Sequence, residues 1–357
     1  MRLGHLPASF GNHAPRILGA VFCVAGMLTT SSCERKNATP DWNTPKTQTT
    51  TAEPAEETSS EFEADIETPE ASKSVTVSTE TTTPSGLRFI TYNVENWLTM
   101  DRYVNRKTIK GASKPEKEKQ AVVAILSRHK PDVVGLCEIG QASDLAEIQE
   151  DLKAAGLDLP HSHYTGGSDP TRHLGLLSRF PITSTAKPAE TEYQLSGQTF
   201  AINRGILDAT IQARGKSYRF LGNHLKSKRD SEQGDQEAIR LNEARLLRRH
   251  VNAILKTNSD TRLIVYGDLN DTRSTPTIKT ITGNYNDPTY LTAIPAKDSR
   301  NQAWTYNWAL HDIYSRIDFI MVSRGIRGDV DFPAAKIIDD SDWDTASDHR
   351  AVLAVFK

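Results

Sequence analysis

The sequence contains little cysteine, 3 of its 357 residues. Cys23 and Cys33 lie near the N-terminus, and Cys137 is the single thiol of the long remainder. The main part of the chain therefore cannot form an internal disulfide. Its stability must come from a hydrophobic core, which a segment of this length is able to build.

The sequence also lacks a strong excess of charge of either sign, with a formal net charge of −2. The first 85 residues carry 6 Lys and Arg against 11 Asp and Glu, whereas the remainder carries 37 against 34. This mild positive balance is compatible with an anionic substrate. It argues against the strongly basic surface of a dedicated duplex-DNA binder.

The one conspicuous apolar run, residues 17–28, is too short for a stable membrane span. It follows Arg2 and Arg16 and has the length of the apolar part of a secretory signal. We therefore expect residues 1–33 to be a signal peptide and the protein to be exported, to the periplasm, the outer envelope or the medium. Residues 29–33 resemble a bacterial lipoprotein cleavage site, which predicts acylation of Cys33 and membrane anchoring. A plain secretory signal, with Cys33 incidental, is the alternative.

Large apolar residues are also scarce in residues 34–85, which are rich in Thr, Ser, Glu and Pro. Such a segment cannot bury enough surface to offset the entropy of ordering it. We expect a disordered acidic tether here. The catalytic or binding domain is then residues 86–357.

Strand and helix patterns alternate in residues 86–357. Helical spacing of apolar residues predicts helices at 116–128 and 235–256. Short apolar runs predict strands at 87–92, 133–137, 174–177, 206–211, 218–221, 263–266, 317–322 and 351–356. Interleaved strands and helices, with strands in the majority, indicate an α/β (α+β) sandwich in a single domain.

Polar residues stand at the ends of six of these strands. They include five acids, namely Glu95, Glu138, Asp268, Asp318 and Asp348. Loop residues at strand ends converge on one edge of a sheet, where these carboxylates would repel one another unless a cation lay between them. Hard oxygen ligands without a zinc-like Cys or His pair favour Mg²⁺ or Mn²⁺. Such a site suits phosphoryl chemistry.

Six short motifs occur in a fixed order along the domain. They are Tyr92-Asn93-Val94-Glu95-Asn96, Leu136-Cys137-Glu138, Asn223-His224-Leu225-Lys226-Ser227-Lys228, Gly267-Asp268-Leu269-Asn270, Arg316-Ile317-Asp318-Phe319 and Ser347-Asp348-His349. Each is weak alone, but the ordered set resembles the endonuclease/exonuclease/phosphatase superfamily. The resemblance implies a four-layer sandwich, two packed mixed β-sheets flanked by helices, with one active site at a rim.

The resemblance also implies roles for particular residues. Glu138 would be the main metal ligand, with Glu95, Asp348 and Asn93 completing or positioning the metal shell. Asp268 would orient or deprotonate the attacking water, and Asn270 would hold the phosphate or a metal-bound oxygen. His349, kept cationic by Asp318, would contact the scissile phosphate. His224 would bind the phosphate or assist the leaving oxygen.

Further basic and aromatic residues have two interpretations each. Arg204 resembles an arginine that steadies the site, but a surface arginine before a strand is the alternative. Lys226, Lys228 and Arg229 would contact substrate phosphates or lie in a solvated loop. Tyr164 and His173 either line the cleft or are structural. Trp304, Tyr306 and Trp308 either stack on substrate or pack in the core.

The motif that contains Lys226 and Lys228 resembles that of extracellular nucleases of the superfamily, which favours an exported nuclease acting on nucleic acid. We expect the protein to be a monomer. A phosphatase or phosphodiesterase for a small phosphate ester, phospholipid or sugar phosphate is the second interpretation. An inactive binding module is the third, although no motif residue is replaced. The sequence shows no hydrophobic hairpin obvious enough to argue for membrane insertion.

Overall fold

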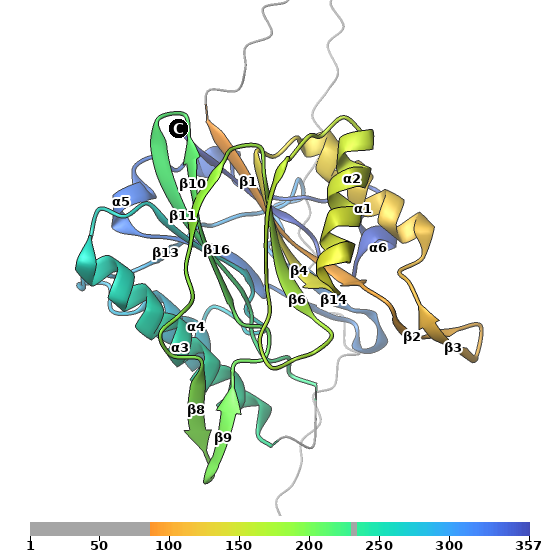
Figure 1. Cartoon of the computed structure of the whole chain (residues 1–357), viewed down its shortest axis with the longest axis horizontal. Helices are drawn as coiled ribbons and strands as arrows, with labels where there is room; N and C mark the ends of the chain where they lie inside the picture. Colours follow the sequence, from red (N-terminus) through yellow and green to blue (C-terminus); the bar gives the residue numbers. More distant parts are fainter. Residues whose placement is uncertain (1–85, 230–233) are drawn as a thin grey trace, which may run out of the picture. The chain divides into compact units, whose positions relative to one another are not determined.

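Two six-stranded mixed sheets form the centre of the protein in the computed structural model, which describes residues 86–229 and 234–357 (Figure 1). The predicted signal peptide, tether and acylated Cys33 lie outside the described residues. Within those residues, no helix is long and apolar enough to cross a membrane.

The first sheet has the strand order β17-β18-β1-β4-β6-β5. Its strands are β1 (Leu87–Trp97), β4 (Val133–Ile139), β5 (His161–Thr165), β6 (His173–Ser178), β17 (Lys336–Ile337) and β18 (Val352–Phe356). β1 pairs parallel with β4 and antiparallel with β18. The first sheet is therefore mixed.

The second sheet has the order β13-β16-β12-β11-β10-β7. Its strands are β7 (Ile182–Thr185), β10 (Ile206–Ala213), β11 (Lys216–His224), β12 (Leu263–Asp268), β13 (Thr292–Ala293) and β16 (Asp318–Val322). β11 and β12 are parallel, and β10 and β16 are antiparallel to them. The second sheet is mixed in the same way as the first.

The sheets pack face to face through aromatic side chains. Phe89 of β1 contacts Phe220 of β11 and Tyr266 of β12, with ring centroids 5.0 and 4.9 Å apart. Gly135 of β4 makes room for this contact, because a Cβ atom there would lie 2.0 Å from the Tyr266 ring. The two sheets can therefore approach closely here, because the Tyr266 ring packs against a residue that has no side chain.

Helices cover the outer face of each sheet. The helices are α1 (Glu116–His129), α2 (Ala142–Ala154), α3 (Gln236–Thr257), α4 (Pro276–Thr282), α5 (Arg324–Arg327) and α6 (Trp343–Ala346). A cluster of buried residues joins α1 and α2 to the outer face of the first sheet, and another joins α3 and α4 to the second. The layers are therefore helices, sheet, sheet, helices, which confirms the predicted four-layer fold.

Three two-stranded hairpins lie outside the sheets. They are β2 (Met100–Val104) with β3 (Lys107–Ala112), β8 (Glu192–Leu195) with β9 (Gln198–Ala201), and β14 (Tyr306–Trp308) with β15 (Ile313–Ser315). Figure 1 shows β2–β3 and β8–β9 projecting from the body of the domain. The 3₁₀ turns Ala309–His311 and Phe332–Ala334 complete the regular structure of the described residues.

The topology brings distant residues to one rim. The strands β1, β4, β11 and β12 all run toward this rim. Glu95 and Glu138 lie within two residues of the ends of β1 and β4, and His224 and Asp268 are the last residues of β11 and β12. The antiparallel strands β16 and β18 begin there, and Asp318 pairs directly opposite Asp268. The six predicted motifs are therefore neighbours in space.

Candidate functional site

The backbone is distorted where β1 and β4 end. Glu95, Asn96 and Glu138 have φ angles of 47°, 58° and 64°, which non-glycine residues rarely adopt. The register of β1 against β4 shifts between Asn93 and Trp97. Such outliers persist only where the surrounding structure holds them, and they are frequent at functional sites. Here they turn acidic side chains toward the rim.

Asn93 is the hub of the site. Its Nδ2 atom donates to Asp268 Oδ2 at 3.0 Å and to Glu138 Oε1 at 3.3 Å. The same nitrogen lies 3.4 Å from His349 Nε2. Its Oδ1 atom accepts from the backbone N–H of Glu95. One buried amide thus joins residues from four strand ends.

Glu138 faces several donors. Its Oε2 atom accepts from the backbone N–H of Asn96 at 3.0 Å and lies 3.8 Å from Arg172 Nε. Its Oε1 atom lies 3.8 Å from His224 Nε2. Arg172, which also donates to Asn96 Oδ1, is a site residue that the sequence did not predict. It directly precedes β6, where a single arginine does not by itself indicate a site.

His349 and Asp318 form a buried pair. His349 Nδ1 lies 2.9 Å from Asp318 Oδ2, and Nε2 lies 3.7 Å from Asp268 Oδ2. Burial alone would lower the pKa of His349, but Asp318 and Asp268 raise it well above its usual value. The imidazole is therefore cationic, donates to Asp318 and directs its other N–H at the centre of the site.

The carboxylates of the site are short of positive charge. Burial, then the nearby carboxylates Asp318 and Glu138, raise the pKa of Asp268 to about 7 even though His349 opposes the rise. Burial and Asp348 raise the pKa of Glu95 to about 7. Burial and Glu138 likewise raise the pKa of Asp348, against the effect of His349. Additional positive charge at this rim would stabilise all three anions.

The donor set fits a hard divalent cation, since every carboxylate contributes oxygen and several carboxylates are crowded together in a buried setting. Asp268, Asp318 and His349 place one ligand atom each within 4.8 Å of one another. However, Asp318 and His349 already bond to each other through Oδ2 and Nδ1. Glu138, which shares Asn93 Nδ2 with Asp268, is the better-placed carboxylate for a cation.

His224 lies close to Glu138, and the positive charge of Arg204 acts on it. Burial and the positive charge of Arg204 lower the pKa of His224 well below its usual value, so this imidazole is neutral. Its Nε2 atom is 3.5 Å from Asp268 Oδ2. Arg204 is buried and lies 3.3 Å from Asp169, which excludes the surface alternative for this arginine.

A buried acid on α3 holds two loops of the site. Glu243 is 0% exposed and accepts from the backbone N–H of Asn203 at 2.9 Å and of Lys226 at 2.6 Å. Those loops carry Arg204 and the lysine motif. The sequence did not mark Glu243, because an acid inside a helix is ordinarily solvated.

The remaining polar candidates are mostly engaged by the protein. Asn270 donates through Nδ2 to the Leu225 carbonyl at 2.9 Å, and its backbone N–H donates to Asp268 Oδ1. Lys226 is 8% exposed, and burial together with Arg204 lowers its pKa. Lys228 forms an ion pair with Asp271 at 3.0 Å. The predicted basic cluster is therefore not a free cationic surface.

Aromatic candidates divide between the site and the core. The Tyr306 ring lies 4.8 Å from the His349 ring, and its hydroxyl bonds to Arg229. Trp304 packs over Arg350, 3.3 Å from its guanidinium. Tyr164 and His173 both bond to the Gly140 carbonyl, which supports the structural interpretation of these two.

The β14–β15 hairpin beside Tyr306 exposes large apolar side chains. The exposed fractions are 39% for Trp308, 83% for Leu310, 44% for Ile313 and 57% for Tyr314. The structure therefore corrects the sequence interpretation, which found no such hairpin. The segment was not predicted as a hairpin because each of its strands is only three residues long, Tyr306–Trp308 and Ile313–Ser315.

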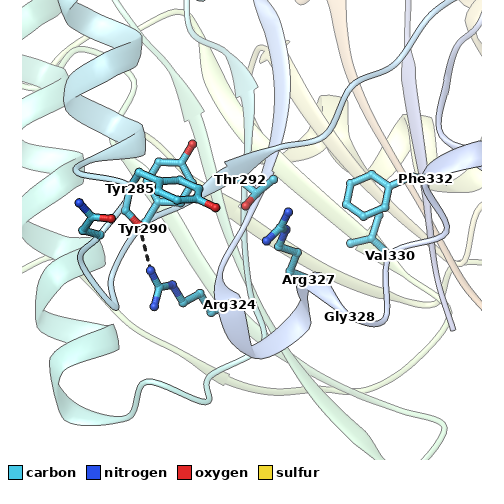
Figure 2. A pocket seen from close by; sticks show the side chains of 9 residues that line it. Tyr285, Tyr290, Thr292, Arg324, Arg327, Gly328, Val330 and Phe332 are labelled. Atoms are coloured by element: carbon cyan, nitrogen blue, oxygen red, sulfur yellow. Dashed lines mark hydrogen bonds between the residues drawn. The ribbon is translucent and has the colours of Figure 1, made fainter.

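A surface recess of ≈ 670 Å³ lies away from this rim, between α5 and the loop before β13. Figure 2 shows Tyr285, Tyr290, Arg324 and Arg327 around it. It contains none of the predicted site residues. It adjoins the end of β16 opposite Asp318, so the carboxylate cluster does not reach it.

Comparison with known proteins identifies the class. The model of the endonuclease/exonuclease/phosphatase family matches residues 91–349, so the chain belongs to this family. It is accordingly a phosphoesterase of a superfamily whose members are metal-dependent hydrolases. No curated protein matches the sequence.

Solved structures share the fold at low sequence identity. A family member from Bacteroides vulgatus is 19% identical, with a TM-score of 0.53 and coverage of 76% of this chain and 99% of that one. A Staphylococcus aureus beta toxin variant with bound magnesium ions is 16% identical, with a TM-score of 0.52 and coverage of 76% and 100%. Sphingomyelinase C from Streptomyces griseocarneus is 17% identical, with a TM-score of 0.51 and coverage of 76% and 99%.

Proposed function

We propose that the protein is an exported, Mg²⁺-dependent nuclease that hydrolyses phosphodiester bonds of nucleic acid as a monomer. The observation that carries the hydrolytic part is the cluster of Asn93, Glu138, Asp268 and His349 at one rim, in which Asn93 Nδ2 donates to both carboxylates and His349 Nε2 lies 3.7 Å from Asp268 Oδ2. This cluster combines the carboxylate of Asp268, which can accept a proton, with the imidazolium of His349, which can face a phosphate.

Glu138 would hold the metal, with Glu95, Asp348 and Asn93 positioning or completing its shell. The ion would supply charge neutralisation for the non-bridging phosphate oxygens. Bound magnesium in the beta toxin structure supports the choice of metal. Mn²⁺ is the alternative that the same oxygen donors would accept.

The protein's own residues would divide the remaining work. Asp268 Oδ2, oriented by Asn93, would accept the proton of the attacking water. His349 Nε2–H would donate to a phosphate oxygen, because Asp318 keeps its ring charged and oriented. Neutral His224 would hold the phosphate or assist the leaving oxygen, with Arg204 steadying the loops and Asn270 fixing Asp268.

The nucleic-acid substrate is proposed from the basic residues along the rim. Lys226, Lys228 and Arg229 follow β11 directly, although only Arg229 faces the site through Tyr306. A polyanion would meet the rim with several phosphates at once.

A phospholipid phosphodiester is the second candidate, and the exposed β14–β15 hairpin favours it. Trp308 and Leu310 would insert into a lipid surface, while the Tyr306 ring keeps its contact with the His349 ring. The similarity in fold to a sphingomyelinase C supports this candidate.

A substrate panel tests the proposal. We expect the exported protein to cleave DNA or RNA and bis(p-nitrophenyl) phosphate, to lose both activities in EDTA, and to regain them with Mg²⁺. Cleavage of sphingomyelin or phosphatidylcholine vesicles without cleavage of nucleic acid would transfer the assignment to the second candidate. Full activity in excess chelator would contradict the metal dependence.

The export part of the proposal rests on residues 1–85. Mass spectrometry of the mature N-terminus would identify an acylated Cys33 or a cleavage elsewhere. Limited proteolysis tests the tether, since residues 34–85 should be cut without loss of catalysis.

A further inference from the structure

The β2–β3 hairpin is connected directly to the catalytic rim, because it follows β1, the strand that carries Asn93 and Glu95. It projects from the body of the domain (Figure 1). Arg102 fixes its base, donating through Nη2 to the carbonyls of Asn96 at 2.7 Å and Leu98 at 3.1 Å. Asn96 in turn donates its N–H to Glu138. The hairpin is thereby held at a defined position relative to the site.

An arginine occupies the tip in an unfavourable backbone conformation. Asn105 and Arg106 have φ angles of 51° and 63°, the pattern of a type I′ turn. Glycine is preferred at the second of these positions because it adopts positive φ without steric cost. Arg106 therefore adopts a strained backbone conformation at a turn position where glycine would form the same turn without strain.

The positive charge of the hairpin is not compensated. Arg106, Lys107 and Lys110 are exposed and form no ion pair among residues 86–229 and 234–357. Asp101, the one acid in residues 98–113, accepts the N–H of Gly111 instead. Three cations without an ion pair thus stand on a hairpin whose base is anchored to the rim through Arg102.

An exposed aromatic ring accompanies these cations. Tyr103 is 73% exposed and pairs across the hairpin with Thr108, on the face that Lys110 shares. Val104 and Ile109 lie on the opposite face, beside Lys107 and Arg102. Because the apolar residues are divided between two faces and the tip is charged, the hairpin suits a polyanion better than an acyl layer.

We propose that the β2–β3 hairpin is a binding arm for single-stranded nucleic acid. Arg106, Lys107 and Lys110 contact phosphates beyond the scissile one, and Tyr103 stacks on an unpaired base. This inference rests on the proposed nuclease function and narrows its substrate to single strands, since a paired base in a duplex does not present its face to Tyr103.

Two variants test the arm. The first combines Arg106→Gly, Lys107→Gln and Lys110→Gln, in which glycine also relieves the strain at the turn, so the protein should remain folded. The second is Tyr103→Ala. The control combines Lys153→Gln, Lys187→Gln and Lys256→Gln, which removes the same charge from exposed lysines outside the rim.

Binding of a fluorescent oligo-dT is measured by anisotropy in EDTA at several salt concentrations. We expect the triple hairpin variant to bind at least about 10-fold more weakly and to lose about 2 from the slope of log K against log salt, at roughly 0.7 per phosphate contact. Tyr103→Ala should weaken binding about 10-fold with little change of slope. The control variant should bind oligo-dT as the native protein does, within about 2-fold. All variants should cleave bis(p-nitrophenyl) phosphate, a small substrate that offers no further phosphates or bases to the hairpin, at the native rate within about 2-fold.

Other outcomes separate the arm from the nuclease proposal. If the native protein cleaves nucleic acid and the hairpin variants bind oligo-dT as the control does, the arm alone is refuted. Cleavage of small esters with neither binding nor cleavage of nucleic acid by the native protein refutes both. A hairpin variant that also loses cleavage of the small ester would have a disturbed active site, which overturns the arm. Binding of the same variants to phosphatidylglycerol vesicles is measured in parallel. A variant that loses vesicle binding but keeps oligo-dT binding would make the hairpin a membrane-binding element, which also overturns the arm.

Discussion

Single residues set the chemistry of the rim, and the Asp318–His349 pair shows how. The raised pKa of His349 depends on Asp318, so Asp318→Asn should lower that pKa. A cationic His349 would then be lost at lower pH, and the alkaline limb of kcat/KM should move to lower pH. The pH profile for bis(p-nitrophenyl) phosphate measures this. An unmoved limb would show that His349 does not act as a cation held by Asp318.

Asp268 is the residue proposed to accept a proton. Asp268→Asn keeps the size of the side chain but removes its negative charge, so kcat should fall about 10²-fold or more. Single-turnover cleavage of the small ester measures this step separately from binding. Near-normal turnover would assign proton transfer to another group. Glu150→Gln, an exposed acid on α2, is the matched control.

Elements place these residues, and α3 does so through Glu243. Glu243→Gln keeps one acceptor but puts an amide NH₂ against a backbone N–H, leaving a buried group unsatisfied at a cost of about 1–3 kcal/mol. The loops with Arg204 and Lys226 should loosen, raising KM for the ester more than kcat falls. Thermal unfolding and steady-state kinetics measure both effects. Equal Tm and KM would refute the positioning role.

Strands and long helices were predictable because burial imposes their periodicity. The predicted helix 235–256 is found as α3, and the strand 133–137 as β4. α2 was not among the predicted helices, although its buried residues Leu145, Ile148 and Leu152 stand at helical spacing in the sequence. The hairpins β2–β3 and β14–β15 were not predicted, because each forms a separate two-stranded sheet outside the two large sheets and so has no long buried apolar run.

The site was predictable in part for the same reason. Its acids lie at the ends of buried strands, so topology alone gathered Glu138, Asp268 and Asp318. Which cations are free was not predictable, since Lys228 is neutralised by Asp271, 43 positions further along the chain. The cluster after β11 is therefore largely engaged, whereas Arg106, Lys107 and Lys110 on β2–β3 form no ion pair among the described residues.

At the scale of the whole molecule, the site opposes stability unless a cation is bound. Glu95 and Asp268 have pKa values of about 7 in the fold, against ordinary values of 4.5 and 3.8. A carboxylate with a raised pKa stabilises the fold below its unfolded-state pKa, and that contribution is lost as pH rises through the folded value. In EDTA, the free energy of unfolding should therefore fall between about pH 4 and pH 7 through these groups.

Magnesium should reverse this loss, because a ligand that binds only the folded state stabilises it by about 2.7 kcal/mol at 100 times its Kd. We expect Tm at pH 8 to rise when Mg²⁺ replaces EDTA, by about 2–4 °C for each kcal/mol in a domain of this size. Glu95→Gln removes one repelling charge, so it should melt higher than the native protein in EDTA at pH 8, yet gain less from Mg²⁺. Glu150→Gln should behave as the native protein in both buffers. If Glu95→Gln melts lower in EDTA, or gains as much from Mg²⁺, then Glu95 does not face the cation and the metal shell must be built on Glu138 and Asp348 without it.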